Sequence, residues 1–278
     1  MAKGTITNRP VGVEPRVRRG YFECRYGQLH IHNAIPPGGG FEEGTPILCL
    51  HHTGGSGRVF EPFLALAGRD RSVYAPDTPG FGESDPPPAR PAVADYAAAI
   101  GDFLDSMRFR QIDVLGFQAG SLFAAELAIA RPKQIRRVVM VSVPILNDSE
   151  RDAFRRGALL PSEDGSQLPL EWKRTLDAYG PGVPLEVRIR AFAEKLKNGP
   201  HTAWALAAAQ QYAARERLAL VTQTTLVLRP RDELWDATLR AREVLPKARF
   251  VDLPEQGSGV FEVAPGTIVE SVKEFLRG

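Results

Sequence analysis

The sequence is poor in cysteine, with only Cys24 and Cys49 among its 278 residues. Two cysteines so far apart in the chain cannot form the disulfide framework of a small secreted domain, and they do not have the spacing of a metal-ligand set. We therefore predict that both are small, buried apolar residues. Neither a metal site nor a cofactor is expected.

Long hydrophobic runs are also missing. The longest nearly apolar stretch, residues 138–146, contains Ser142 and Pro144 and is far shorter than the ~20 residues of a membrane-spanning helix. The first residues of the chain are polar and basic, without the apolar segment of a secretory signal. The expectation is a cytoplasmic protein with no anchor and no membrane partner.

The chain has no large excess of positive or negative charge. The chain has 35 lysine and arginine residues against 33 aspartate and glutamate residues, a formal net charge of +2. Nucleic-acid binding needs basic residues gathered on one face, so no nucleic acid is expected among the partners. A small-molecule ligand or substrate is predicted instead, and a homodimer is left open.

What is present is an alternation of strand and helix patterns. Several apolar runs lack polar alternation, which is typical of parallel strands covered on both faces. Segments with helical spacing lie between them, such as the stripe that begins at Val93 and Tyr96. The pattern predicts an α/β fold with a doubly wound, layered sheet. The predicted strands are residues 29–31, 46–50, 72–75, 112–115, 137–143, 225–228 and 250–253.

The alternation breaks between residues 146 and 223, where helical stripes occur without a strand pattern. An all-helical insertion of this kind is expected over the carboxyl edge of the sheet, where open α/β folds bind ligands. We therefore predict a core of residues 21–145 and 224–278, a helical cap of residues 146–223 and an N-terminal extension of residues 1–20.

A sharp turn is predicted where the strand 112–115 meets the following helix. The connecting residues 116–120 read GFQAG. Glycines two positions before and two after Gln118 allow a strained strand-turn-helix that pushes the Gln118 side chain outward at the start of the helix.

This turn resembles the nucleophile elbow of the α/β-hydrolase superfamily. Three more segments follow that superfamily's order: residues 51–55 resemble its oxyanion loop, residues 77–84 the loop after the next strand, and residues 226–232 the strand and turn that carry the triad acid. The similarity covers about residues 21–276. It implies a mostly parallel, eight-stranded sheet flanked by helices, with a helical cap that shapes a pocket. It also places Thr53 or His52, together with Ala119, at an oxyanion hole, and Phe117 beside the substrate.

Two positions of the superfamily's Ser-His-Asp triad depart from its pattern. Gln118 stands at the nucleophile and Ser258 at the histidine, while Asp232 matches the acid, and none of the five histidines follows Asp232. A carboxamide cannot form an acyl intermediate, so ordinary serine-hydrolase turnover is not expected. Without a histidine to orient, Asp232 is interpreted as a turn residue bonded to nearby backbone or to Ser258.

The histidines leave alternatives open. Either His51 or His52 could carry a proton for chemistry at the oxyanion hole. The alternative for His51 is a structural role, and the alternative for His52 is contact with a ligand. Gln118 either contacts a ligand or holds loops together. His201 is expected to be packed or exposed. His30 and His32 share one face of a strand, and we predict that this face is solvent-exposed while Leu29 and Ile31 face the core.

The sequence leaves three alternative functions open. The first is an enzyme that uses the oxyanion hole for non-covalent chemistry on an apolar carbonyl compound. The second is a non-catalytic small-molecule binder, and the third is a scaffold protein with a vestigial pocket. The intact glycines and loop motifs favour the first.

Overall fold

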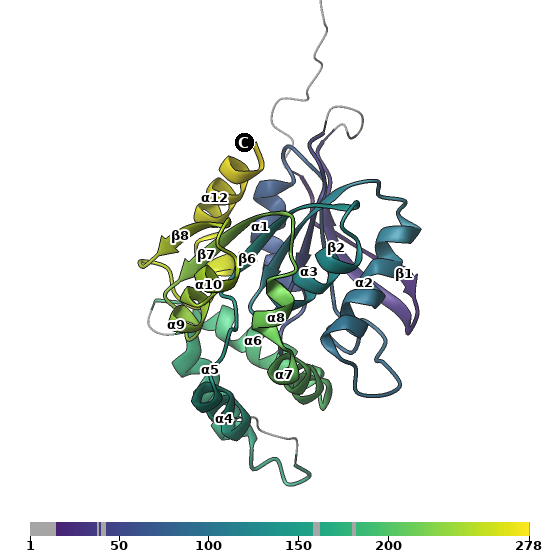
Figure 1. Ribbon diagram of the computed structural model, residues 1–278. Coiled ribbons are helices and arrows are strands. Elements are labelled where there is room, and N and C mark those ends of the chain that lie inside the picture. The colour runs from purple at the N-terminus through teal and green to yellow at the C-terminus, as the bar shows by residue number, and fades with distance from the viewer. Residues whose placement is uncertain (1–14, 38, 40–42, 158–161, 180–181, 278) are drawn as a thin grey trace, which may run out of the picture.

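The computed structural model describes residues 15–37, 39, 43–157, 162–179 and 182–277. Residues 1–14 of the predicted N-terminal extension lie outside this part. The centre of the molecule is an eight-stranded sheet in the order β1-β2-β4-β3-β5-β6-β7-β8 (Figure 1). The pairs β1–β2 and β2–β4 are antiparallel, and the other neighbours are parallel. The predicted mostly parallel sheet of eight strands is confirmed. The strands are β1 (Arg18–Cys24), β2 (Gly27–Ala34), β3 (Ile47–Leu50), β4 (Val73–Pro76), β5 (Ile112–Phe117), β6 (Ile135–Val141), β7 (Thr224–Pro230) and β8 (Arg249–Leu253).

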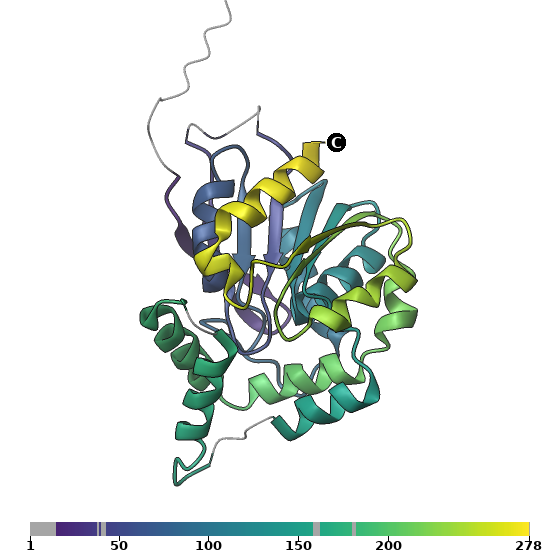
Figure 2. The same cartoon turned by 90° about the vertical axis from the view of Figure 1, so that its left-hand side faces the viewer.

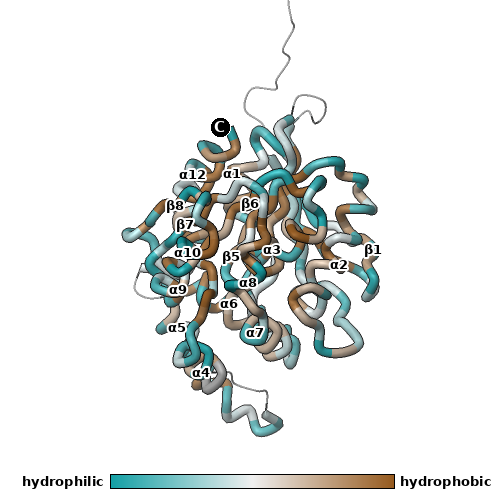
Figure 3. The backbone as a smooth tube through the Cα atoms, viewed as in Figure 1, coloured by the Kyte–Doolittle hydropathy of each residue, from teal (hydrophilic) through white to brown (hydrophobic). Residues whose placement is uncertain are grey.

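Helices cover both faces of the sheet. Successive side chains of a strand point to opposite faces, so Leu48 and Leu50 of β3 pack in one apolar layer while Ile47 and Cys49 pack in the other. Figure 3 shows the central strands and α3 as mostly hydrophobic and the outer loops as hydrophilic. The first layer includes α2 (Val93–Ser106) and α3 (Ala119–Ala130), and the second includes α1 (Glu61–Ala67), α11 (Val260–Val263) and α12 (Pro265–Arg277).

The described residues between β6 and β7 form helices and connecting loops and include no strand. The helices α4 to α7 gather at the end of the sheet opposite the C-terminus (Figures 1 and 2). They are α4 (Asp148–Gly157), α5 (Leu168–Tyr179), α6 (Leu185–Lys197) and α7 (His201–Gln211), followed by α8 (Ala214–Leu218). The remaining short helices are η1 (Gly57–Phe60), α9 (Trp235–Leu239) and α10 (Ala241–Val244).

Three details differ from the sequence-based expectations. The edge strand β1 was not among the strands predicted from apolar runs, because its residues are only partly buried, and it begins at Arg18, inside the predicted N-terminal extension. Cys49 is fully buried as predicted, whereas Cys24 is only half-buried. His30 and His32 are 3% and 1% exposed, so the prediction of a solvent-facing pair is wrong.

The physical reason is that β2 is covered on both faces. Nδ1 of His30 lies 2.8 Å from Oδ2 of the buried Asp77, which follows β4. On the same face, Nδ1 of His32 lies 3.3 Å from a carboxylate oxygen of Glu61, the first residue of α1. A period-two pattern shows that two residues share a face, but it does not show what covers that face.

Candidate functional site

Gln118 lies at the turn between β5 and α3 with φ 51° and ψ −118°, a left-handed conformation that is strained for a residue with a side chain. The flanking glycines make the turn possible. A Cβ at Gly116 would lie 2.3 Å from the carbonyl oxygen of Gly120, and a Cβ at Gly120 would lie 2.0 Å from that of Leu50. Only glycine fits at either position, and the predicted sharp turn is present.

The Gln118 side chain is hydrogen-bonded to a residue that the sequence analysis did not select. Its Nε2 donates to Oε1 of Glu233 at 2.8 Å, and Oγ of Ser258 donates to Oε2 of the same carboxylate at 3.2 Å. Glu233 thus bridges the two positions that the resemblance assigns to the nucleophile and the histidine. The available signal was the adjacent pair of acids Asp232 and Glu233 directly after β7.

Asp232 points elsewhere. Its Oδ2 accepts a hydrogen bond from Oγ of Ser142 at 2.6 Å, and its Oδ1 accepts one from the backbone N–H of Leu234 at 2.9 Å. The predicted bond to nearby backbone is therefore present, whereas the side-chain partner is Ser142. Burial, and then the negative charge of Glu233, raises the pKa of Asp232 to about 6 against the opposing effect of these two hydrogen bonds and of the Gln118 side chain.

His51 is held within the fold. It is 1% exposed, and its Nε2 accepts a hydrogen bond from the backbone N–H of Thr78 at 2.9 Å. That bond makes Nδ1 the protonated nitrogen, and Nδ1 donates to the carbonyl of His52 at 2.7 Å. Burial lowers the pKa of His51. Both nitrogens of the neutral ring are engaged in joining two loops.

His52 faces the space in front of the elbow. Its ring lies 5.2 Å from that of Phe117, and its buried Nδ1 has no hydrogen-bond partner among the described residues. Burial, followed by the charges of the neighbouring His51 and Lys195, lowers the pKa of His52 to about 3. The ring is therefore neutral at pH 7. Ala119 is the first residue of α3, so its backbone N–H has no acceptor within the helix.

A cavity of about 720 Å³ lies in front of these groups. Helices α5, α6 and α7 supply one side of its lining, including the ion pair of Lys195 with Glu171. The loops after β3, β5, β7 and β8 supply the other. Of the residues predicted for the site, the cavity is lined by His52, Thr53, Phe117, Gln118 and Ser258. A volume of this size suits a small organic molecule.

His201 lies at the start of α7 and is packed, in line with the prediction. Its ring stands 5.0 Å from that of Trp204, and Nδ1 lies 3.1 Å from the carbonyl oxygen of Asn198. A Cβ added at Gly80 would lie 2.9 Å from the His201 ring, which shows how closely the ring covers that loop.

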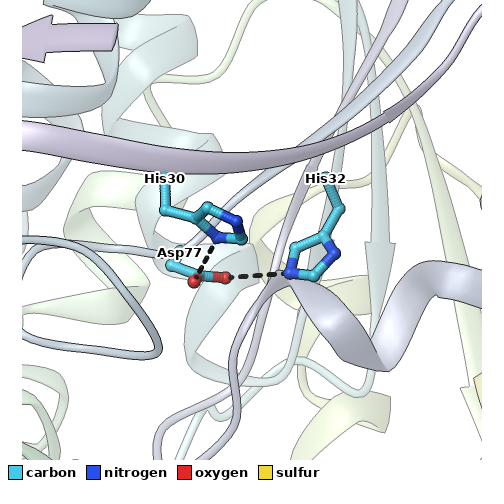
Figure 4. A group of neighbouring side chains, drawn as sticks. All are labelled: His30, His32 and Asp77. Atoms are coloured by element: carbon cyan, nitrogen blue, oxygen red, sulfur yellow. Dashed lines mark hydrogen bonds and ion pairs between the residues drawn. The ribbon is translucent and has the colours of Figure 1, made fainter. Parts of the chain in front are cut away.

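The buried histidines of β2 form a separate cluster with Asp77 (Figure 4). Nδ1 of His30 lies 2.8 Å from Oδ2 of Asp77, and Nε2 of His32 lies 3.7 Å from Oδ1. The ligand atoms of the three residues lie within 4.8 Å of one another, a spacing that a metal ion could use. The carboxylate already accepts hydrogen bonds from the backbone N–H groups of Gly57 at 2.7 Å and Glu83 at 2.9 Å. A cation would have to displace these bonds, so the cluster is best described as an anchor for the loops after β3 and β4.

Comparison with known proteins agrees with the fold. Residues 45–245 match the family model of the alpha/beta hydrolase fold, and the chain belongs to this family. No helix within the described residues is long and apolar enough to cross a membrane.

Two of the three relatives described here carry hydrolase names. A 2-hydroxymuconate semialdehyde hydrolase of Pseudomonas putida is 39% identical over 119 residues, which cover 37% of this chain and 40% of that protein. RutD of Pseudomonas savastanoi pv. phaseolicola, a proposed carbamate hydrolase, is 26% identical over 252 residues, which cover 84% of this chain and 94% of that protein. An uncharacterized protein of Mycobacterium tuberculosis is 28% identical over 116 residues, and the chain spans only 34% of its length.

Solved structures show the same fold. A hydrolase from Pseudomonas aeruginosa PA01 superposes with a TM-score of 0.78 at 22% identity, covering 94% of this chain and 98% of that one. The enol-lactonase of Burkholderia xenovorans LB400 superposes with a TM-score of 0.76 at 15% identity, covering 93% of this chain and all of that one (100%). Identities this low are evidence for the fold alone.

Proposed function

We propose that this protein is an enzyme that binds an apolar carbonyl compound under a helical cap, residues 146–223, and acts on it without an acyl intermediate. Gln118 and Ser258 occupy the nucleophile and histidine positions of the triad. An amide at the nucleophile position cannot attack the substrate carbonyl, and a serine at the histidine position cannot act as the general base that acyl transfer needs. The reaction class that fits the remaining groups is proton transfer next to a carbonyl.

The observation that carries this proposal is the bridge made by Glu233. Its two oxygens are held by Nε2 of Gln118 at 2.8 Å and Oγ of Ser258 at 3.2 Å, on the wall of the cavity. A carboxylate fixed by two donors is oriented for use as a general base. It reaches the cavity, whereas His51 is engaged inside the fold.

The counterpart of a base is a group that stabilises negative charge on the substrate. In the proposed reaction, Glu233 removes a proton from the carbon next to a carbonyl. The electrons of the broken C–H bond move to the carbonyl oxygen, and that oxyanion lies against the N–H of Ala119 at the start of α3, with Thr53 or His52 completing the hole. The ring of Phe117, against which the neutral ring of His52 packs at 5.2 Å, provides an apolar part of the cavity wall.

The name of one relative is compatible with a carbonyl ligand. The P. putida relative is named for a semialdehyde, which is a carbonyl compound, and its similarity covers 37% of this chain. That name supports a carbonyl ligand here without specifying which one.

The test is solvent-deuterium exchange. The protein is incubated in D₂O with a panel of 2-alkanones and 1,3-diketones, and loss of the α-proton signals is followed by ¹H NMR. We expect exchange above the buffer rate, and Glu233→Gln should reduce it by about 10²-fold or more, as expected for loss of a general base. The exposed Glu255→Gln serves as the matched control.

The same experiment distinguishes the proposed enzyme from a second candidate function, a non-catalytic small-molecule binder. Chemical-shift changes on the protein without any exchange across the panel would contradict the proposal and favour a non-catalytic binder. The hydrogen bonds that hold Gln118 and Ser258 in the cavity wall are the observation in favour of that alternative.

A further inference from the structure

A second, smaller cavity of about 180 Å³ adjoins the larger one. The two share the lining residues His52, Gly54, Tyr179, Ala191 and Glu262, so these residues form the wall between them. The sequence analysis did not select Glu262 or Tyr179. Glu262 lies on α11, four residues after Ser258, and Tyr179 is the last residue of α5.

The smaller cavity is lined by polar atoms that lack partners. Nδ1 of His52, Oε2 of Glu194 and Oε2 of Glu262 are all buried without a hydrogen bond among the described residues. Native structures rarely leave buried polar atoms unsatisfied, and three around one small cavity indicate a polar occupant. Water fits best, because it can donate to both carboxylate oxygens and a cavity of 180 Å³ holds several molecules.

The surroundings of Glu262 favour a carboxyl group that carries a proton. Burial raises the pKa of Glu262 to about 7, and a hydrogen bond from Tyr179 and the charge of Arg190 oppose that rise. Burial, followed by the charges of Glu262 and Glu233, raises the pKa of Tyr179, so its phenol stays protonated and donates. The charged and titratable groups that line the two cavities together with Glu262 are Arg58 of η1, Glu171, Arg174 and Tyr179 of α5, Arg190, Glu194 and Lys195 of α6, and His52 and Glu233 of the loops. Nε of Arg58 lies 3.1 Å from Oε1 of Glu194.

We propose that Glu262 is the proton donor of this site, that the smaller cavity is its hydrated proton path, and that the substrate is an unsaturated carbonyl compound whose double bond migrates. The inference rests on the proposed function, because it needs Glu233 as the base. Here Glu233 is oriented by its hydrogen bonds to Gln118 and Ser258, and Glu262 lines the same cavity with its Oε2 buried, so one can act as base and the other as acid.

The step balances without a further reactant. Glu233 takes the α-proton of a β,γ-unsaturated carbonyl compound, the C–H bond breaks, and a dienolate forms with its oxyanion at Ala119. The carboxyl group of Glu262 gives its proton to the γ-carbon, a new C–H bond forms, and the product is the conjugated isomer. Glu233 is now protonated and Glu262 ionised, and water returns the proton from one to the other. The isomerisation needs no oxidant or reductant.

The experiment uses the full chain with cyclohex-3-en-1-one as the probe. Conjugation is followed by ultraviolet absorbance, and deuterium incorporation at the α-carbon is followed by NMR in parallel samples. The wild-type protein is expected to form the conjugated enone. Glu262→Gln should lower the ratio of enone formed to deuterium incorporated by about 10²-fold, because amides do not protonate carbon at neutral pH. Glu270→Gln, an exposed change on α12, should leave the ratio unaltered.

Tyr179 acts through Glu262, and its test is a pH profile. Enone formation should decline as pH rises through the pKa of Glu262, about 7. Tyr179→Phe removes a hydrogen bond that lowers this pKa, so the decline should move to higher pH. A merely structural role would change the rate at every pH without moving the profile.

The outcomes separate the two proposals. An unaltered ratio in Glu262→Gln, or deuterium incorporation without any enone in the wild-type protein, overturns the role of Glu262 and leaves the proposed function standing. The absence of deuterium incorporation in the wild-type protein overturns the proposed function and this inference with it.

Discussion

Replacing Glu262 with glutamine should change how the stability of the protein depends on pH. The glutamate has a pKa of about 7 in the folded protein against its usual value of 4.5. A carboxyl group whose pKa is raised by folding stabilises the folded state fully below the unfolded pKa. That stability is lost as pH rises through the folded pKa, because the unfolded chain ionises first and binds fewer protons. Glutamine keeps the shape of the side chain and does not titrate.

The size of the effect follows from the two pKa values. A rise of this extent corresponds to about 3 kcal/mol when it is complete. Between pH 5 and pH 8, the free energy of unfolding of the wild-type protein should fall by about 2.5 kcal/mol relative to that of the variant. Asp232 also titrates with a raised pKa, about 6, but it is present in both proteins, so its contribution cancels in the difference.

The assay is urea unfolding at half-unit intervals from pH 5 to pH 8, read by far-ultraviolet circular dichroism, with the m-value compared at each pH. Glu270→Gln, which changes an exposed glutamate of α12, provides the baseline. A difference between the wild-type protein and Glu262→Gln that changes by less than about 0.5 kcal/mol over this range would refute the idea that burial holds a proton on Glu262.

Further predictions concern the elbow, the buried histidines and the acid after β7. Gly120→Ala places a Cβ 2.0 Å from the Leu50 carbonyl oxygen and should destabilise the protein by about 3 kcal/mol in urea unfolding, whereas Gly266→Ala, where a Cβ meets nothing within 4 Å, should not. His30→Ala removes a donor to buried Asp77 at 2.8 Å and should cost about 2 kcal/mol in the same assay; a cost under about 0.5 kcal/mol would count against the anchoring role. Ser142→Ala removes a hydrogen bond that stabilises ionised Asp232, so the pKa of Asp232, followed by ¹³C NMR, should rise above about 6, and an unchanged value would contradict that contact. A fluorophosphonate probe should not label the wild-type protein, and the double change Gln118→Ser with Ser258→His should create labelling and esterase activity; a folded but inert double variant would show that these positions do not correspond to nucleophile and base.

The elbow could be predicted because its demands are local. A turn this tight needs glycine where a Cβ would strike a backbone carbonyl, and Gly116 and Gly120 are both at such positions. The apolar strands were also readable, since a strand buried on both faces has a continuous apolar run. The edge strand β1 was not, because its partly exposed residues leave no such run.

The histidines of β2 show the opposite case. His30 and His32 were expected to face solvent, and they are buried against Asp77 and Glu61. Asp77 follows β4, and Glu61 begins α1, so the covering groups come from segments more than 25 residues away. No pattern within the strand reports such a contact.

The sequence by itself predicted, from the order of its motifs, that Gln118, Asp232 and Ser258 correspond to the three triad positions, and it determined that no histidine follows Asp232. Only the tertiary structure decided which acidic side chains contact the predicted triad positions and which are buried. Folding joins Gln118 and Ser258 through Glu233, turns Asp232 toward Ser142, and buries Glu262 beside Tyr179. The protonation state and hydrogen bonds of a carboxyl group depend on how much water its neighbours exclude and which donors reach it, and both are properties of segments that meet only in the folded molecule.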